Sequence, residues 1–244
     1  MIITSKSNSK IRETAKLIAD RKYREESGLY VVEGIKPVNE CIATKCGVTE
    51  IICVESLANN YPSAIVVTES VFKSVSSEKS PQGVLAVVKT PVFDMLPPEG
   101  SCLLLDKIQD PGNLGTILRT ANAAGYKDIY LINCTDAYSP KCVRASMSGI
   151  FFVKVHAGDR ETIIETLKGI PLVCGALDGE NIFNFVPPDK FCLCIGNEGG
   201  GISREILEIS DYKVKIPMTD TCESLNAAVS AGIAMYQLKN SKQR

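Results

Sequence analysis

The strongest constraint on this chain is an alternation of apolar segments with helical segments, which repeats through its second half. Apolar runs such as 102–105 and 128–132 have the length of buried strands. Between them, Asp110 and Pro111 form an N-cap followed by a proline at the first helical position, and Gly125 suits the end of that helix. Strands that alternate with helices predict an α/β fold with a doubly wound parallel sheet.

The first hundred residues have a different character. An amphipathic helix with a basic face is predicted up to Arg24, and short strands and one further helix follow it. Proline and glycine concentrate between residues 90 and 100, which predicts a break in the chain. We therefore expect a small α/β domain over residues 1–93, a linker over 94–100 and a larger domain over 101–244.

Three local expectations are specific enough to be tested by a structure. The basic helix is expected to be continuous through Arg24, residues 151–155 are expected to form a strand, and the final helix is expected to run from Glu223 to about Lys239. His156, the only histidine, ends the expected strand, and we expect it to have a structural role.

Composition excludes several classes of protein. With 45% hydrophobic and 23% charged residues, the chain is unlike collagen, coiled coils or disordered proteins. It has no apolar run of about 18 residues and no signal-peptide run at its start, so we expect no membrane span and a cytoplasmic location. The ten cysteines form no Cys-x-x-Cys pair, and one histidine cannot build a multi-histidine site, so no metal is expected.

Three polar loops are expected to follow strand ends in the second domain, where ligands bind in such sheets. They span residues 105–125, 195–203 and 216–230. Neither the dinucleotide-binding glycine pattern, the P-loop nor the nucleophile elbow of hydrolases is present, so a dehydrogenase, an NTPase and a hydrolase of those types are not indicated. Grouped polar loops at one edge of a sheet predict a single site.

The three loops together resemble the three motifs of the SpoU (TrmH-type) branch of the SPOUT RNA methyltransferases. Order and spacing agree, and the first 93 residues are similar to the substrate-binding domain, related to ribosomal protein L30e, that often precedes this fold. Asp220 departs from the pattern, since the family usually has glycine there. The matched positions are Asp110, Pro111, Asn113, Gly115, Arg119, Thr120, Ala121 and Gly125, then Gly196, Asn197, Glu198, Gly199 and Gly201, and finally Ile216, Pro217, Met218, Ser224, Leu225 and Asn226.

This resemblance implies a fold, a reaction and a set of roles. It implies a deep trefoil knot in the second domain, a homodimer, and S-adenosylmethionine-dependent methylation of a ribose 2′-hydroxyl in structured RNA. The cofactor-binding residues it implies are Gly196, Ile216 and Leu225. The catalytic set it implies is Asn113, Arg119, Glu198, Ser224 and Asn226. Because a guanidinium stays protonated, we expect Arg119 to stabilise negative charge or grip a phosphate rather than act as a base.

The partner is expected to be RNA, with large-subunit ribosomal RNA as the first expectation and transfer RNA as the second. A formal net charge of −1 argues against a nucleic-acid partner unless the basic residues gather on one face. Two competing hypotheses are a non-catalytic RNA-binding or assembly factor and an enzyme that acts on a small molecule. The residues expected to bind RNA are Lys6, Lys10, Arg12, Arg21, Lys22, Arg24 and Arg144.

Overall fold

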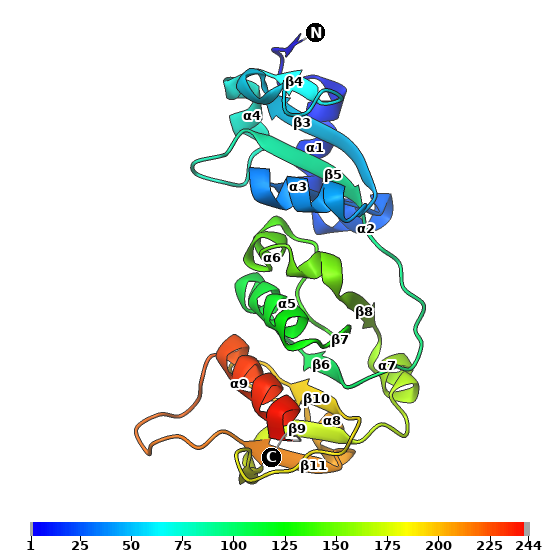
Figure 1. Ribbon diagram of the computed structural model, residues 1–244, viewed down its shortest axis with the longest axis vertical. Helices are drawn as coiled ribbons and strands as arrows, with labels where there is room; N and C mark the ends of the chain where they lie inside the picture. Colours follow the sequence, from blue (N-terminus) through cyan, green and yellow to red (C-terminus); the bar gives the residue numbers. More distant parts are fainter. Residues whose placement is uncertain (1, 242–244) are drawn as a thin grey trace.

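Two β-sheets organise the chain, one on each side of a proline-containing segment at residues 90–101 (Figure 1). The computed structural model describes residues 2–241. The first sheet and its helices occupy one end of the molecule, and the second sheet with its helices occupies the other (Figure 1). The break lies where the sequence predicts the linker, and the exact domain limits stay a prediction.

The first sheet is mixed, with strand order β1-β4-β3-β5-β2, and β5 is antiparallel to both of its neighbours. Helices α1 and α4 cover one face, where Leu17 and Phe72 are buried, and α3 covers the other with Val38. The strands are β1 (Ile2–Ile3), β2 (Leu29–Glu33), β3 (Val48–Val54), β4 (Ile65–Val67) and β5 (Val84–Lys89). The helices are α1 (Ser9–Ala19), α2 (Arg21–Ser27), α3 (Ile35–Ala43), the short η1 (Glu55–Leu57) and α4 (Glu69–Val75).

The second sheet has the strand order β11-β9-β10-β6-β7-β8, and every pair in it is parallel. Residues of α5 and α9 pack on one face with Leu103, and residues of α7 and α8 pack on the other with Leu104. The strands are β6 (Cys102–Asp106), β7 (Asp128–Ile132), β8 (Lys154–Gly158), β9 (Leu172–Asn181), β10 (Cys192–Ile195) and β11 (Tyr212–Lys215). The helices are α5 (Pro111–Ala124), α6 (Pro140–Ala145), η2 (Gly149–Phe152), α7 (Arg160–Thr166), α8 (Arg204–Glu208) and α9 (Ala227–Asn240). The predicted doubly wound parallel sheet is confirmed; the trefoil knot and the likeness to L30e stay predictions.

The three local expectations, which concerned the bounds of two helices and one strand, were wrong. The basic helix breaks at Asp20, which ends α1 and caps α2 by accepting a hydrogen bond from the Tyr23 backbone. The aromatic residues expected in a strand form the 3₁₀ turn η2, so β8 starts only at Lys154. The last helix begins at Ala227 rather than Glu223, because the Asn226 side chain accepts bonds from the backbone of its first turn.

The interface between the two domains is built by residues to which the sequence analysis gave no role in domain contact. The Tyr30 ring of β2 lies 4.9 Å from the ring of Tyr138, which precedes α6. Beside them, the Arg24 guanidinium is 7% exposed and pairs with Asp136 at 2.7 Å. The Arg24 guanidinium is therefore buried and already paired, so this arrangement does not support RNA binding by Arg24, which stays an untested prediction.

Candidate active site

The site forms where the three polar loops meet beyond the carboxyl ends of β6, β10 and β11. Asn113, in the first turn of α5, donates from Nδ2 to Glu198 Oε1 at 2.6 Å. Asn226, the N-cap of α9, donates from Nδ2 to Asn113 Oδ1 at 2.9 Å. The Asn113 amide is thus held from both ends, and three residues expected to act together from positions up to 113 apart lie in contact.

The N-terminus of α5 is fixed by the cap chemistry that the sequence indicates. Asp110 Oδ1 accepts a hydrogen bond from the Asn113 backbone N–H at 2.9 Å. Its other oxygen pairs with Lys141 Nζ of α6 at 2.6 Å. The hydrogen bond from Lys141, followed by the one from the Asn113 backbone, lowers the pKa of the Asp110 carboxyl below its usual 3.8.

The glycine-rich loop after β10 turns sharply and is closed by Asn197. The backbones of Asn197 and Gly201 exchange two hydrogen bonds of 3.0 Å, and Gly201 has a φ of 65°. Asn197 Nδ2 also donates to the carbonyl of Lys107 at 2.9 Å, which ties this loop to the end of β6. Sequence reasoning did not assign a role to Asn197; its position inside the second motif was the available signal.

A cavity of about 390 Å³ lies beside this polar cluster. The three residues expected to bind the cofactor, Gly196, Ile216 and Leu225, all line it. Glu198 and Ser224 line it too, so the polar cluster and the cavity share a wall. The described lining does not include Asn113, Arg119 or Asn226.

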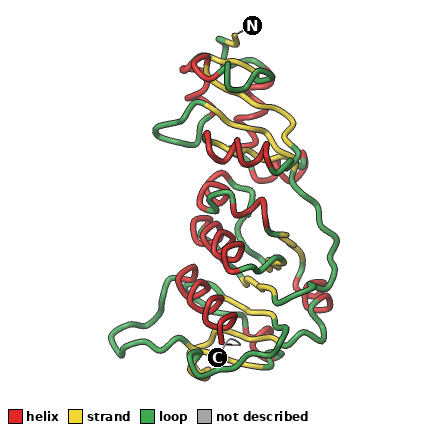
Figure 2. Tube along the Cα trace, in the orientation of Figure 1, coloured by secondary structure: helices red, strands yellow, loops and turns green. Residues whose placement is uncertain are grey.

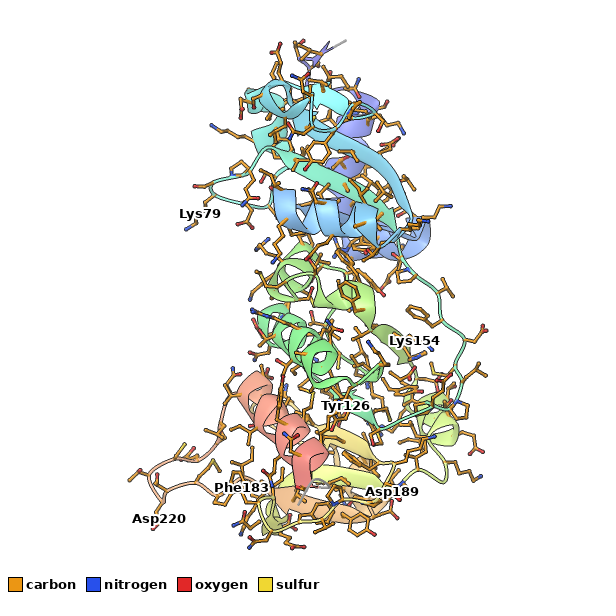
Figure 3. The ribbon with its side chains drawn as sticks, viewed as in Figure 1. Lys79, Tyr126, Lys154, Phe183, Asp189 and Asp220 are labelled. Atoms are coloured by element: carbon orange, nitrogen blue, oxygen red, sulfur yellow. The ribbon has the colours of Figure 1, made fainter. Side chains whose placement is uncertain are left out.

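The third loop, residues 216–226, extends away from the body of the protein (Figure 2). Asp220, the position that departs from the family pattern, lies at the outer end of this loop (Figure 3). It is exposed and is not among the residues that line the cavity. The Asp220 carboxylate is therefore exposed to solvent.

Arg119 is the catalytic candidate that the structure does not bring into the cluster. It lies on α5, six residues beyond Asn113, and its side chain is exposed. It forms no ion pair or hydrogen bond through its side chain within residues 2–241. Gly149 packs closely against its backbone, since a Cβ at Gly149 would lie 2.8 Å from the Arg119 Cα.

Most of the expected RNA-binding cations already have acidic partners. Lys10 pairs with Glu50, and the hydrogen bond between them raises the Lys10 pKa above its ordinary value. Arg144 of α6 reaches the first domain, where its Nη1 lies 2.5 Å from Glu78 Oε1. Two further cations pair along their own helix, in the pairs Arg21–Glu25 and Lys22–Glu26. Lys6 and Arg12 are exposed, and neither forms an ion pair with a residue that the structure describes.

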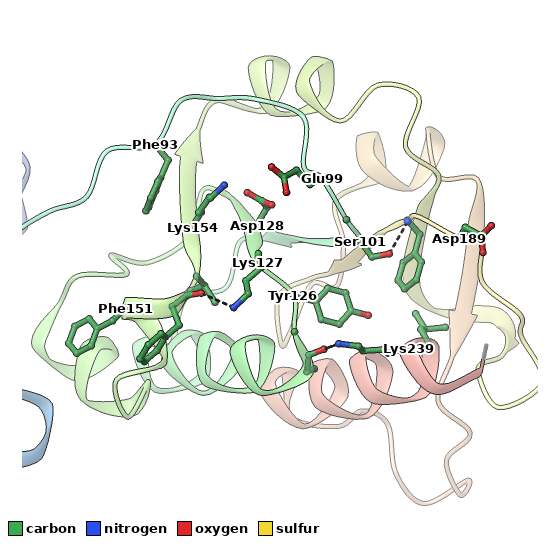
Figure 4. A pocket seen from close by; sticks show the side chains of 17 residues that line it. Phe93, Glu99, Ser101, Tyr126, Lys127, Asp128, Phe151, Lys154, Asp189 and Lys239 are labelled. Carbon is green, nitrogen blue, oxygen red and sulfur yellow. Dashed lines mark hydrogen bonds between the residues drawn. The ribbon is translucent and has the colours of Figure 1, made fainter. Parts of the chain in front are cut away.

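A second cavity, of about 570 Å³, lies at the opposite edge of the sheet (Figure 4). Tyr126, which precedes β7, and Asp128, its first residue, help to line it, together with Lys239 of α9. Next to it, His156 is 4% exposed, and its Nε2 lies 3.1 Å from Asp128 Oδ1. The His156 ring stacks on Tyr130 at 4.8 Å, which agrees with the structural role expected for it.

The comparison with known protein families decides which family this arrangement belongs to. Residues 100–236, more than half of the chain, match the model described as the SpoU rRNA Methylase family. The chain belongs to the SpoU rRNA methylase family. Residues 8–86 match a second model, the MRM3-like substrate binding domain, so both domains of this SpoU methylase have recognised counterparts.

Individual relatives match over nearly the full length of this SpoU methylase. A Bacillus subtilis protein named 23S rRNA (guanosine(2553)-2′-O)-methyltransferase RlmP is 31% identical over 246 residues, covering 97% of this chain and 98% of that one. A Streptomyces viridochromogenes 23S rRNA (uridine(2479)-2′-O)-methyltransferase is 28% identical and covers 96% of this chain and 90% of its own length. Among solved structures, the AdoMet-bound rRNA methyltransferase of Sinorhizobium meliloti has a TM-score of 0.89 at 25% identity, covering 98% of this chain and 97% of that one.

Proposed function

We propose that this protein transfers a methyl group from S-adenosylmethionine to a ribose 2′-hydroxyl of structured RNA, with large-subunit ribosomal RNA as substrate. The observation that carries the proposal is the hydrogen-bonded cluster of Asn113, Glu198 and Asn226, of which Glu198 lines the 390 Å³ cavity. The names of the Bacillus and Streptomyces relatives, both 23S rRNA 2′-O-methyltransferases, support the same reaction and substrate.

The residues around the cavity suit this cofactor. The backbone turns so tightly at Gly196 that a Cβ there would lie 2.2 Å from the Gly201 carbonyl carbon, so only glycine allows this close cradle. Ile216 and Leu225 add apolar walls, which suit an adenine ring. When bound there, S-adenosylmethionine would supply a methyl group activated by its sulfonium charge. The Sinorhizobium relative was crystallised as an AdoMet-bound rRNA methyltransferase, which supports this choice of cofactor.

The chain's own side chains would orient and activate the ribose. Asn113, held between Glu198 and Asn226, has one amide hydrogen left to position a ribose or phosphate oxygen. Glu198 orients Asn113, and Ser224 completes the polar wall. Arg119, free of any acidic partner among the described residues, would stabilise the negative charge that develops on the hydroxyl oxygen or bind the neighbouring phosphate.

Because no described contact joins the Arg119 side chain to the cluster, we infer a homodimer in which each site is completed across an interface. Val229 and Tyr236 of α9 are 50% and 47% exposed, and α9 packs beside α5, which carries Arg119. We propose that this face of the two helices pairs with a second copy. We further propose that Lys6 and Arg12 bind RNA phosphates. We also propose that the protein is located in the cytoplasm.

Between residues 2 and 241, no helix is long and apolar enough to span a membrane. In the same part of the chain, no three His, Cys, Asp or Glu side chains gather in a way that could hold a metal ion.

The direct test measures transfer of labelled methyl from S-adenosylmethionine to defined RNAs. We expect label in large-subunit ribosomal RNA and none in transfer RNA, with loss of transfer in both Arg119→Ala and Arg119→Lys. Label in transfer RNA only would contradict the proposal that ribosomal RNA is the substrate. Binding of the cofactor without transfer to any RNA would favour an assembly factor, and neither binding nor transfer would favour a small-molecule enzyme. Mapping of 2′-O-methyl sites in cells with and without the gene identifies the nucleotide.

A further inference from the structure

Asp106, the last residue of β6, is a fully buried carboxylate in a strand that is otherwise apolar. Its side chain is 0% exposed. Oδ2 accepts a hydrogen bond from the Ser203 backbone N–H at 2.6 Å, and Oδ1 is buried without a hydrogen-bond partner among the described residues. No ion pair to a described Lys, Arg or His compensates its charge. Burying a carboxylate in this way costs stability, so its presence calls for a role.

The residue that Asp106 holds closes the glycine-rich loop. Ser203 is the N-cap of α8 and follows directly on the segment 196–202. At its start, the same loop is tied to β6 by the bond from Asn197 to the Lys107 carbonyl. Asp106, the last residue of β6, and Lys107, which follows it, therefore anchor the loop at both of its ends.

This double anchorage matters because the loop has little stiffness of its own. Gly199, Gly200 and Gly201 are consecutive, and glycine gains more backbone freedom than any other residue when it is released. The same loop carries Gly196 and Glu198, which line the candidate cofactor cavity. Loss of either anchor would let both of these residues leave the positions described above.

We propose that Asp106 is a positioning residue, whose buried carboxylate fixes the glycine-rich loop through the Ser203 N–H and thereby shapes the cofactor cavity. The proposal rests on the proposed function in that the cofactor is S-adenosylmethionine. Asp106 acts through the backbone, and it does not touch the substrate. A role as a direct counter-charge to the cofactor's sulfonium makes a different prediction, since that role requires a cationic ligand.

The test compares binding of S-adenosylmethionine and of neutral S-adenosylhomocysteine by calorimetry, using the full chain. Asp106→Asn keeps the size of the side chain but removes the charge-assisted bond. We expect about a 10-fold to 100-fold loss of affinity for both ligands alike. The matched control is Asp211→Asn, because Asp211 also accepts a backbone N–H, from Leu172 at 2.8 Å, but does not line the cavity. It should leave both affinities within about twofold of the wild type.

A second variant removes the donor instead of the acceptor. Ser203 has a φ of −60°, which proline can adopt, so Ser203→Pro deletes the N–H with little change of backbone angle at that residue. If the two groups act through one bond, the double variant Asp106→Asn/Ser203→Pro should bind no more weakly than the weaker single variant. Additive losses would contradict the proposal.

Hydrogen exchange of peptides covering 196–203, measured without ligand, keeps the proposal testable whatever the cofactor is. We expect faster exchange there in Asp106→Asn and unchanged exchange in Asp211→Asn. Unchanged exchange in Asp106→Asn, affinities within about twofold of the wild type, or loss of S-adenosylmethionine binding alone would each overturn the proposal. A wild-type protein that binds neither ligand would instead overturn the proposed function, while the exchange result would still decide the role of Asp106.

Discussion

Replacing Asp136 by alanine should destabilise the whole chain, because it removes the carboxylate that pairs with Arg24 between the two domains. Asp136 Oδ2 accepts a hydrogen bond from Arg24 Nε at 2.8 Å and lies 2.7 Å from Nη2. The two side chains are 14% and 7% exposed. After the substitution, the guanidinium would keep only the carbonyls of Leu17 and Ile18 as partners among the described residues.

The size of the effect follows from this burial. Removing one partner of a buried ion pair costs about 3–5 kcal/mol, because the remaining charge stays desolvated. The two carbonyl acceptors that remain for Arg24 and the partial exposure of Asp136 place the loss at the lower end, about 3 kcal/mol. In a chain of this size, that loss lowers the melting temperature by roughly 6–12 °C.

Calorimetric melting measures the loss, and Asp178→Ala is the control. The Asp178 carboxylate is 70% exposed and lies 3.3 Å from Lys213, so its removal should cost less than about 0.5 kcal/mol. In parallel, Arg24→Met should melt early yet keep the RNA affinity and salt dependence of the wild type. An Asp136→Ala protein that melts like the wild type would refute this reasoning. The reasoning would also be refuted if, in Arg24→Met, the dependence of RNA affinity on salt concentration fell by the equivalent of about one phosphate contact.

Three further outcomes are expected. Gly196→Ala should weaken S-adenosylmethionine binding about tenfold or more in equilibrium dialysis, because its Cβ would overlap the backbone of the same loop, whereas Gly100→Ala has open space around it and should not. The lowered pKa of Asp110 gives stability that is present above its ordinary value of 3.8 and is lost as the pH falls further; Asp110→Asn should therefore unfold with a shallower pH dependence in acid, as should a Lys141→Met variant. Iodoacetamide at neutral pH should label exposed Cys222 first, because burial raises the pKa of several other thiols, and mass spectrometry of the native protein would contradict this if a buried cysteine reacted earlier.

The parts of the fold that the sequence predicts correctly are those set by local chemistry. Asp110 and Ser139 accept the backbone bonds expected of N-caps, and Gly125 ends α5 with a φ of 78°. The apolar runs of β6 and β7 pair in parallel, as their length and burial pattern indicate. Each cap depends on neighbours within a few residues, and each strand is recognised from its own apolar run, so the sequence displays both directly.

The sequence did not predict features that depend on contacts between residues far apart along the chain. Arg24 looks like a surface cation in the sequence, but its carboxylate partner is 112 residues away and becomes its neighbour only when the domains dock. Asp106 looks like the polar end of a strand, and only the folded loop shows that it holds Ser203. For the site, the sequence predicts the contacts of Asn113 through the family motifs, whereas the isolation of Arg119 depends on which face of α5 each residue occupies.

The shared core of the two domains has a consequence for modular engineering. Tyr30 and Tyr138 belong to one continuous apolar cluster that runs from the first domain into the second, and the Arg24–Asp136 ion pair also joins the two domains. The two domains therefore cannot be exchanged independently of each other. A chimera that grafts residues 1–93 onto the catalytic half of another family member would inherit a defined orientation only if the recipient also carries the counterparts of Asp136 and Tyr138.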